Sequence, residues 1–140
     1  MIRFAFLLSL LLPAFAASAD TLDRFAGRYL GCAVSGGELV PIETTFVATV
    51  DGLAGKYVFI ESTGRRIAGA ITPKDRQSAD PVAVTWSDVY GEGPAVFTFA
   101  DDGSRFDGYW MSGGGTDRFS WNGVRSGSGK RPPDCRVPVS

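Results

Sequence analysis

Carboxylates are the side chains of this chain whose number and spacing could support acid–base chemistry. Glu38, Glu61, Glu92 and Asp117 lie in or beside glycine-rich segments, and two such groups facing each other could hydrolyse a glycosidic bond. The chain has no histidine, which removes the usual general base and the commonest metal ligand. Scattered carboxylates are also what solubility requires. The pattern therefore predicts no catalytic residue, and a hydrolase stays the third hypothesis.

Two further patterns point to ligand chemistry but have the wrong spacing. The triple glycine 113–115 lacks the helix start and the Lys-Ser/Thr pair of a phosphate-binding loop. Asp101, Asp102 and Asp107 lack the twelve-residue loop and terminal glutamate of a calcium site. We interpret both segments as turns, and we expect no metal and no cofactor.

The two cysteines, Cys32 and Cys135, predict one disulfide. Without a histidine to activate a thiol, a catalytic cysteine is disfavoured. Two cysteines in an exported chain favour a bond between them. This bond would tether the irregular tail, residues 126–140, to the first strand.

The N-terminal segment has the pattern of a signal peptide. Arg3 precedes an apolar run over residues 4–12, and Ala17-Ser18-Ala19 forms a small-residue cleavage site. The run is shorter than the ~20 residues that span a bilayer, so residues 1–19 predict export to the periplasm or secretion, with no stable membrane anchor. A net charge of −1 and the lack of a basic run exclude a nucleic-acid partner.

Glycine and proline divide the rest of the chain into pieces too short for most helices. The longest stretch free of both after the signal is 42–51, whereas a mean helix has about 11–12 residues. Aromatic and β-branched residues, often alternating, fill the pieces. The predicted strands are Gly27–Val34, Ile42–Val50, Lys56–Glu61, Arg66–Thr72, Val82–Trp86, Ala95–Ala100, Arg105–Met111 and Arg118–Arg125.

Short connections make consecutive strands antiparallel neighbours. We therefore expect an all-β domain over residues 20–125, an antiparallel up-and-down barrel of about eight strands, because closure hides both sheet edges. A two-sheet sandwich is the alternative. Asp20–Phe25 could form one helical turn that closes a barrel end, with Thr21 as its N-cap.

The first strand, 27–31, reads Gly-Arg-Tyr-Leu-Gly, and the late strands carry tryptophan in 106–110 and 119–125. In these features an exported chain of this size resembles the calycin-type barrels, which include lipocalins, avidins and small bacterial inhibitors of secreted proteases. The resemblance implies binding rather than catalysis.

In such a meander, alternate loops lie at the same end of the barrel. Loops 35–41, 62–65, 87–94 and 112–117 would then form one glycine-rich rim, which suits a ligand mouth or a partner contact, although ordinary solvated turns look the same. Trp86, Trp110 and Trp121 either line a cavity or fill the core. The predicted rim residues are Glu38, Arg65, Arg66, Tyr90, Glu92, Trp110, Asp117 and Arg118.

These observations together predict an exported, monomeric, non-catalytic binding protein. It would hold a small apolar or aromatic ligand in the barrel, or contact a protein of the cell envelope at the rim. The alternative function is a periplasmic inhibitor of a protease or another envelope hydrolase.

Overall fold

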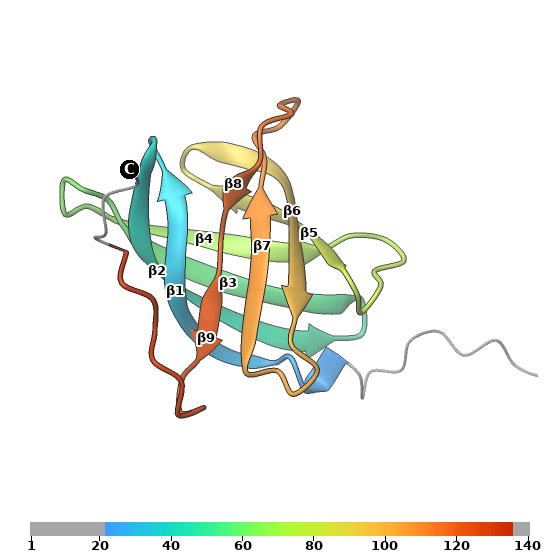
Figure 1. The fold of residues 1–140 in the computed structure, drawn as a ribbon. Helices are drawn as coiled ribbons and strands as arrows, with labels where there is room; N and C mark the ends of the chain where they lie inside the picture. Colours follow the sequence, from blue (N-terminus) through green and yellow to red (C-terminus); the bar gives the residue numbers. More distant parts are fainter. Residues whose placement is uncertain (1–21, 136–140) are drawn as a thin grey trace, which may run out of the picture.

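The computed structural model describes residues 22–135. The predicted signal segment 1–19, Asp20, the candidate N-cap Thr21 and residues 136–140 lie outside the described residues. Most of the described chain is extended (Figure 1), and within it no helix is long and apolar enough to cross a bilayer. The strands are β1 (Gly27–Ser35), β2 (Glu38–Thr49), β3 (Gly52–Ile60), β4 (Arg66–Pro73), β5 (Val82–Asp88), β6 (Gly91–Phe99), β7 (Arg105–Trp110), β8 (Phe119–Ser120) and β9 (Gly123–Arg125).

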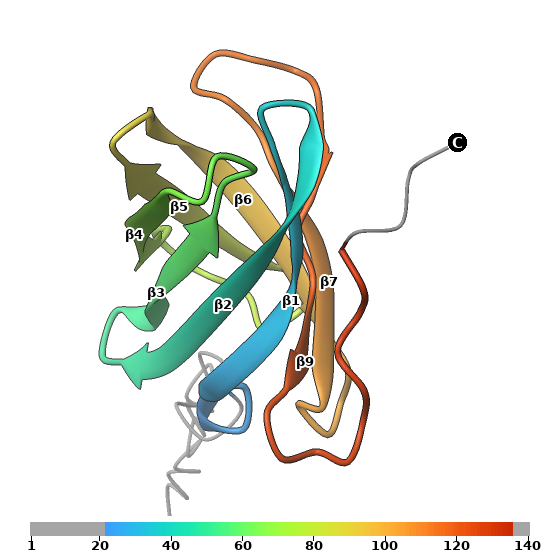
Figure 2. The same cartoon turned by 90° about the vertical axis from the view of Figure 1, so that its left-hand side faces the viewer.

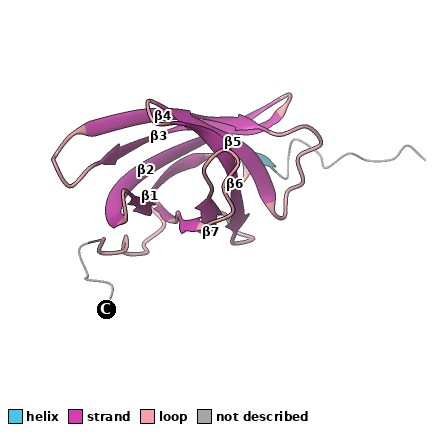
Figure 3. Cartoon of the chain, turned by 90° about the horizontal axis from the view of Figure 1, so that it is seen from above, coloured by secondary structure: helices cyan, strands magenta, loops and turns pink. Residues whose placement is uncertain are grey.

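The strands close into a barrel. Each strand from β1 to β7 pairs antiparallel with the next, and β9 pairs with both β1 and β7. Eight strands thus form a closed up-and-down barrel, and β1 to β7 can be followed in Figure 3. β8 is an extra strand that pairs with β7. The predicted barrel is confirmed, and the sandwich is excluded because the hydrogen-bonded ladder runs round without an edge.

Three strands begin earlier than the sequence predicts, because their hairpins are tighter. Gly36 and Gly37 have φ of 59° and 79°, the left-handed geometry of a two-residue hairpin, so β2 begins at Glu38.

Two prolines lie inside strands for the same reason. Pro41 lies beyond the last residue of β2 that pairs with β3, and Pro94 lies beyond the last of β6 that pairs with β7, so their missing N–H groups remove no ladder bond there.

The predicted last strand, Arg118–Arg125, is interrupted at Trp121 and Asn122. β8 and β9 pair with the two ends of β7, through Trp110↔Phe119 and Phe106↔Gly123. Between them the Asn122 N–H donates to the Cys32 carbonyl (2.9 Å), and the Cys32 N–H donates to Asn122 Oδ1 (3.0 Å). These two bonds hold the interrupted segment against β1.

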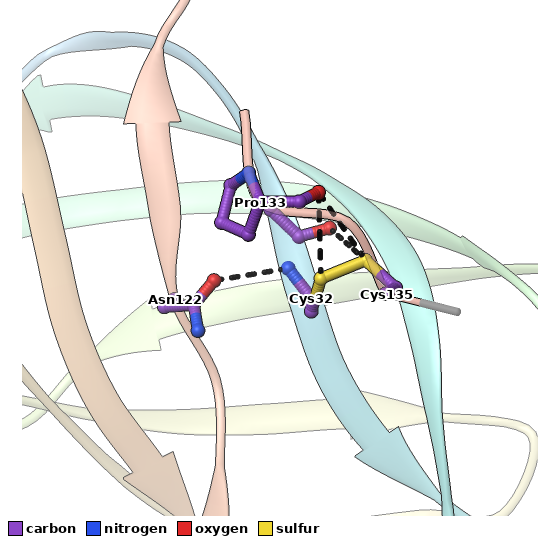
Figure 4. Close-up of a disulfide and its surroundings, with 5 residues drawn as sticks. Cys32, Asn122, Pro133 and Cys135 are labelled. Carbon is purple, nitrogen blue, oxygen red and sulfur yellow. Dashed lines mark hydrogen bonds between the residues drawn. A yellow bond between two sulfur atoms is a disulfide. The ribbon is translucent and has the colours of Figure 1, made fainter. Parts of the chain in front are cut away.

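The predicted disulfide joins Cys32 of β1 to Cys135, 103 residues further along the chain. Figure 4 shows Pro133 and Cys135 of the tail lying beside β1, with Asn122 on the other side of Cys32. Cys32 is fully buried there. A structural disulfide indicates an oxidising location outside the cytoplasm.

One end of the barrel is closed by the N-terminal turn, at the bottom of Figure 2. The N–H groups of Phe25 and Ala26 donate to the carbonyls of Leu22 and Asp23 (3.0 and 3.1 Å). Leu22 and Phe25 are buried, and the Phe25 ring stacks on Phe99 with centroids 4.4 Å apart. The described part of the predicted turn is therefore present and closes the barrel.

Arg125 fastens this turn to the last strand. Its guanidinium donates to the carbonyls of Ala26 (2.7 Å), Gly103 (2.7 Å) and Arg24, and to the Tyr29 hydroxyl (2.9 Å). The group also lies over the Tyr29 ring, 5.1 Å from its centroid. Charge-assisted bonds of this kind are about twice as strong as neutral ones.

Aromatic rings fill the barrel above this end. Phe46 meets Tyr29, Phe97, Phe99 and Phe106 edge to face, with centroids 5.2–5.7 Å apart. These rings are buried, and edge-to-face packing is the favourable geometry for close aromatic pairs. The lower and middle barrel is therefore a packed core.

Candidate functional site

The opposite end of the barrel is open and contains a pocket of about 60 Å³, which we call the mouth pocket. It lies at the end predicted to carry the glycine-rich loops, which is uppermost in Figure 2. Its lining residues are Ala33, Val34, Ser35, Ile42, Tyr57, Phe59, Trp86, Asp88, Tyr90, Trp110 and Trp121.

Strand alternation explains why these side chains meet. Tyr57 and Phe59 are two residues apart in β3 and point to the same face, and Trp86 and Asp88 do the same in β5. Tyr90 lies in the turn after β5 and also lines the pocket. The inward positions near the open end thus carry large rings, interrupted by a single carboxylate.

The three indoles are held by hydrogen bonds within the protein. Trp86 Nε1 donates to the Met111 carbonyl (2.8 Å), Trp110 Nε1 to the Val34 carbonyl (3.0 Å), and Trp121 Nε1 to Thr44 Oγ1 (3.0 Å). Trp86 and Trp110 also meet edge to face, with centroids 5.3 Å apart. The rings are therefore oriented before any ligand arrives, and their N–H groups are already used.

Two glycines make room for this arrangement. Gly69 of β4 faces Tyr57 across the sheet, and a Cβ there would lie 2.1 Å from the tyrosine ring. Gly93 of β6 faces Trp86, and a Cβ there would lie 2.3 Å from the Met111 carbonyl that accepts the Trp86 N–H. The sequence thus places its smallest residue opposite two of its largest, where the backbone or a ring must approach closely.

Asp88 is the polar centre of the mouth pocket. Its Oδ2 accepts the Tyr57 hydroxyl (2.7 Å) and its Oδ1 accepts the Tyr90 N–H (2.8 Å). Burial raises the pKa of Tyr57, and the hydrogen bond to Asp88 and the charge of Asp88 raise it further. Tyr57 therefore remains a neutral donor at physiological pH.

Tyr90 brings a second carboxylate to the rim, because its hydroxyl donates to Glu61 Oε1. This bond is the main cause of the raised pKa of Tyr90, which the nearby charge of Arg65 opposes. Glu61 follows β3 immediately, so the bond links the β3–β4 loop to the β5–β6 hairpin.

The base of the mouth pocket is the top of the packed core. The Trp121 ring meets Tyr57 of the pocket at 4.9 Å and Phe97 of the core at 5.0 Å, and it is buried. The sequence allowed two roles for the tryptophans, lining a cavity and filling the core, and both are observed. All three line the pocket, and Trp86 and Trp121 are core residues as well.

The structure separates the eight predicted rim residues into two groups. Tyr90 and Trp110 line the mouth pocket. The other six are exposed and do not line it: Glu38, Arg65, Arg66, Glu92, Asp117 and Arg118.

Arg118 shows why position in a rim loop is not enough to place a side chain. Its guanidinium lies over the ring of Tyr109, 4.4 Å from the centroid. Tyr109 precedes Trp110 in β7, so it points to the outer face. Arg66 also acts outside the pocket. Its charge helps to lower the pKa of Glu43, although the ion pair with Arg28 is the main cause.

Sequence reasoning missed Tyr57, Phe59 and Asp88. The signal for Asp88 was the spacing Trp86-x-Asp88, which puts a carboxylate on the same face of one strand as an aromatic residue. Tyr57 had no comparable signal, because its position opposite Gly69 depends on the register between β3 and β4.

Among residues 22–135, no three acidic or cysteine side chains come together as a metal site requires. Comparison with known proteins found no matching family model, no similar curated protein and no similar solved structure. The mouth pocket is therefore interpreted from its own geometry.

Proposed function

We propose that this chain is an exported, non-catalytic binding protein that holds one small apolar or aromatic group in the mouth pocket, either in the periplasm or after secretion. The observation that carries this proposal is the ring of aromatic side chains fixed by their own hydrogen bonds around an open pocket. A site that is ordered before binding loses less entropy when the ligand arrives.

The size of the pocket limits the ligand. Sites for drug-sized molecules measure roughly 300–1,000 Å³, whereas the mouth pocket measures about 60 Å³. Phe46, Phe97 and Phe106 fill the barrel beneath it. The occupant is thus a single ring or compact group, and the rest of its molecule lies outside the barrel.

The polar groups of the pocket support binding rather than hydrolysis. Asp88 is the single carboxylate among the lining residues, and it accepts hydrogen bonds from Tyr57 and from the Tyr90 main chain. Hydrolysis by a carboxylate pair needs a second group across the site, and Glu61 is engaged with the Tyr90 hydroxyl.

Tryptophan fluorescence tests the proposal directly. Small neutral and charged aromatic and alkyl compounds should change the emission of the protein in a saturable way. Trp110→Ala should abolish the change, because it removes a wall of the pocket and the bond to the Val34 carbonyl. Tyr109→Ala, the adjacent outward position, is the matched control and should bind as the wild type does. No saturable change with any compound would refute the proposal.

A specific observation supports the second candidate, a protein partner at the rim such as a protease or another envelope hydrolase that the chain inhibits. Val89 and Tyr90 at the β5–β6 hairpin are 66% and 57% exposed, and tyrosine is enriched among the residues that dominate binding at protein interfaces. In assays with purified secreted proteases, an inhibitor would reduce turnover stoichiometrically, and Val89→Asp would remove that inhibition while leaving small-compound binding intact.

A further inference from the structure

We propose that the group bound in the mouth pocket is cationic, and that the ligand is a small organic compound with an alkylammonium or quaternary ammonium head. This inference rests on the proposed function and specifies its ligand class. Three features of the pocket carry it: the aromatic wall, the carboxylate within that wall, and the opening to solvent.

The aromatic wall supplies the first part of a cation site. Trp86, Trp110 and Trp121 line it together with Tyr57 and Tyr90. The indole N–H groups, which are the positive edges of these rings, are directed at oxygens of the protein. The indoles therefore present no free N–H donor that would repel a cation. The faces of Trp and Tyr rings attract positive charge, and this attraction is stronger in partly desolvated sites.

Asp88 supplies the second part. Its two hydrogen bonds come from neutral donors, the Tyr57 hydroxyl and the Tyr90 N–H, so they orient the carboxylate without cancelling its charge. Among residues 22–135, the ion pairs are Arg28–Glu43 and Arg105–Asp107, and Asp88 takes part in neither. A cation bound beside this half-buried carboxylate would be attracted to it more strongly than to a carboxylate fully surrounded by water.

The charged groups on other elements around the pocket also favour a positively charged ligand. Glu61 lies beyond Tyr90, whose hydroxyl it binds. Arg65 is exposed in the loop before β4 and does not line the pocket, and its charge opposes the rise in the pKa of Tyr90. Asp88 is thus the single charged side chain among the residues that line the pocket, and no basic side chain lines it.

The third part is the shape of the site. A compact head surrounded by methyl or methylene groups suits an opening of about 60 Å³ and gains from apolar contact as well as from charge. The packed core below excludes a long acyl chain, so the remainder of the ligand extends into solvent, past Ser35 and Tyr90.

A pair of compounds with the same shape separates charge from apolar contact. Choline and its neutral analogue 3,3-dimethyl-1-butanol differ in the replacement of the ammonium nitrogen by carbon. In calorimetric or fluorescence titrations of the wild-type protein, choline should bind about tenfold tighter. Its affinity should fall as sodium chloride is added, whereas the affinity of the neutral compound should not.

Two variants locate the charge responsible. Asp88→Asn should reduce choline affinity about tenfold and leave the neutral analogue unchanged, since the amide oxygen can still accept the Tyr90 N–H and the amide NH2 can donate to the Tyr57 hydroxyl oxygen. Glu92→Gln is the matched control, because Glu92 is exposed at the same end but does not line the pocket. A poorly folded Asp88→Asn protein would leave the wild-type titrations as the deciding measurement.

The outcomes distinguish this inference from the proposed function. Equal affinity for the two compounds, or a loss of choline affinity in Glu92→Gln as large as in Asp88→Asn, would overturn the cation site while leaving a neutral binding pocket. Binding of neutral aromatic compounds with no binding of choline would do the same. No binding of any compound would overturn both.

Discussion

Both ends of the barrel place a charged side chain among aromatic rings, Arg125 at the closed end and Asp88 at the open end, but the two charges are used in opposite ways. At the closed end Arg125 lies over Tyr29 and donates to three main-chain carbonyls and a hydroxyl. At the open end Asp88 lies among Tyr57, Trp86 and Tyr90 with two neutral donors. Arg125 is thus used within the fold, whereas Asp88 retains capacity for an external partner.

With the proposed function, this difference would separate stability from binding within one architecture. The hydrogen bonds of Arg125 connect the N-terminal turn, the loop after β6 and the last strand, so they stabilise the fold as a whole. The bonds of the open end hold each ring in place around a space. Changes at the two ends should therefore affect different measurements.

The largest expected loss of stability comes from removing the disulfide, which belongs to neither end of the barrel. Replacing Cys32 and Cys135 by alanine opens a cross-link over 103 residues. In the chain-entropy model this lowers the free energy of unfolding by about 4–5 kcal/mol. Urea unfolding of the wild type with and without reductant, beside the double variant, measures it. A difference below about 1 kcal/mol would show that the tail contributes little.

Arg125→Met should break the closed end alone. It removes the charge-assisted bonds to the carbonyls of Ala26 and Gly103 while keeping an apolar chain over Tyr29, and it should cost about 3 kcal/mol of unfolding free energy. Arg118→Met, which removes an exposed cation from the half-buried ring of Tyr109, should cost less than about 1 kcal/mol.

The comparison predicts that folded Arg125→Met protein still binds ligand at the open end with the wild-type affinity. Titration well below its unfolding midpoint checks this. A loss of affinity in the folded variant would mean that the two ends are coupled through β1, which runs past both.

The barrel itself was predictable from sequence because it depends on patterns of short range. Glycine and proline limit the length of each element, alternation selects one buried face, and short connections force antiparallel neighbours. The strand bounds were less predictable, since Pro41 and Pro94 lie where the pairing with one neighbour has ended. That position depends on the register of a third strand, which no local pattern contains.

The mouth pocket was predictable only in part. Tyr90 and Trp110 follow from the sorting of loops and strands to one end. The exposed rim residues, such as Arg118, were grouped with them because chain position fixes the end of the barrel but not the face of the strand. Tyr57 and Gly69 meet through a cross-strand register, which is a long-range property of the folded sheet.

Gly69→Ala tests the open end at an intermediate scale. The added Cβ would lie 2.1 Å from the Tyr57 ring, so the ring must move and its bond to Asp88 is lost. We expect the free energy of unfolding to fall by about 2 kcal/mol. We also expect the folded variant to bind ligand more weakly than the wild type, an effect that the loss of stability alone does not explain. Ala70→Val, an exposed position on the same strand, should change stability by less than about 0.5 kcal/mol. Wild-type binding by Gly69→Ala would show that the Tyr57 position is not needed.

The smallest effect is the hydrogen bond between Tyr57 and Asp88, which Tyr57→Phe removes. Near pH 8 the variant should be less stable by about 1 kcal/mol. The dependence on pH is more specific than this magnitude. Burial and the Asp88 bond raise the pKa of Tyr57 in the folded protein, whereas an unfolded tyrosine titrates near pH ~10. The stabilisation is therefore complete below that pH and is lost as the pH rises above it.

The difference in unfolding free energy between wild type and Tyr57→Phe should thus be constant from pH 7 to 9 and shrink at higher pH, by at most about 1.4 kcal/mol per pH unit. Urea unfolding at pH 8, 9, 10 and 10.5 measures it. Phe59→Leu alters the ring that stacks on Tyr57 but keeps the hydroxyl, so its difference from wild type should not shrink. A Tyr57→Phe difference that widened above pH 10 would mean that the folded protein releases this proton more readily than the unfolded chain. The hydroxyl would then not be held by Asp88, and the carboxylate would lack the neutral donor that leaves its charge available at the open end.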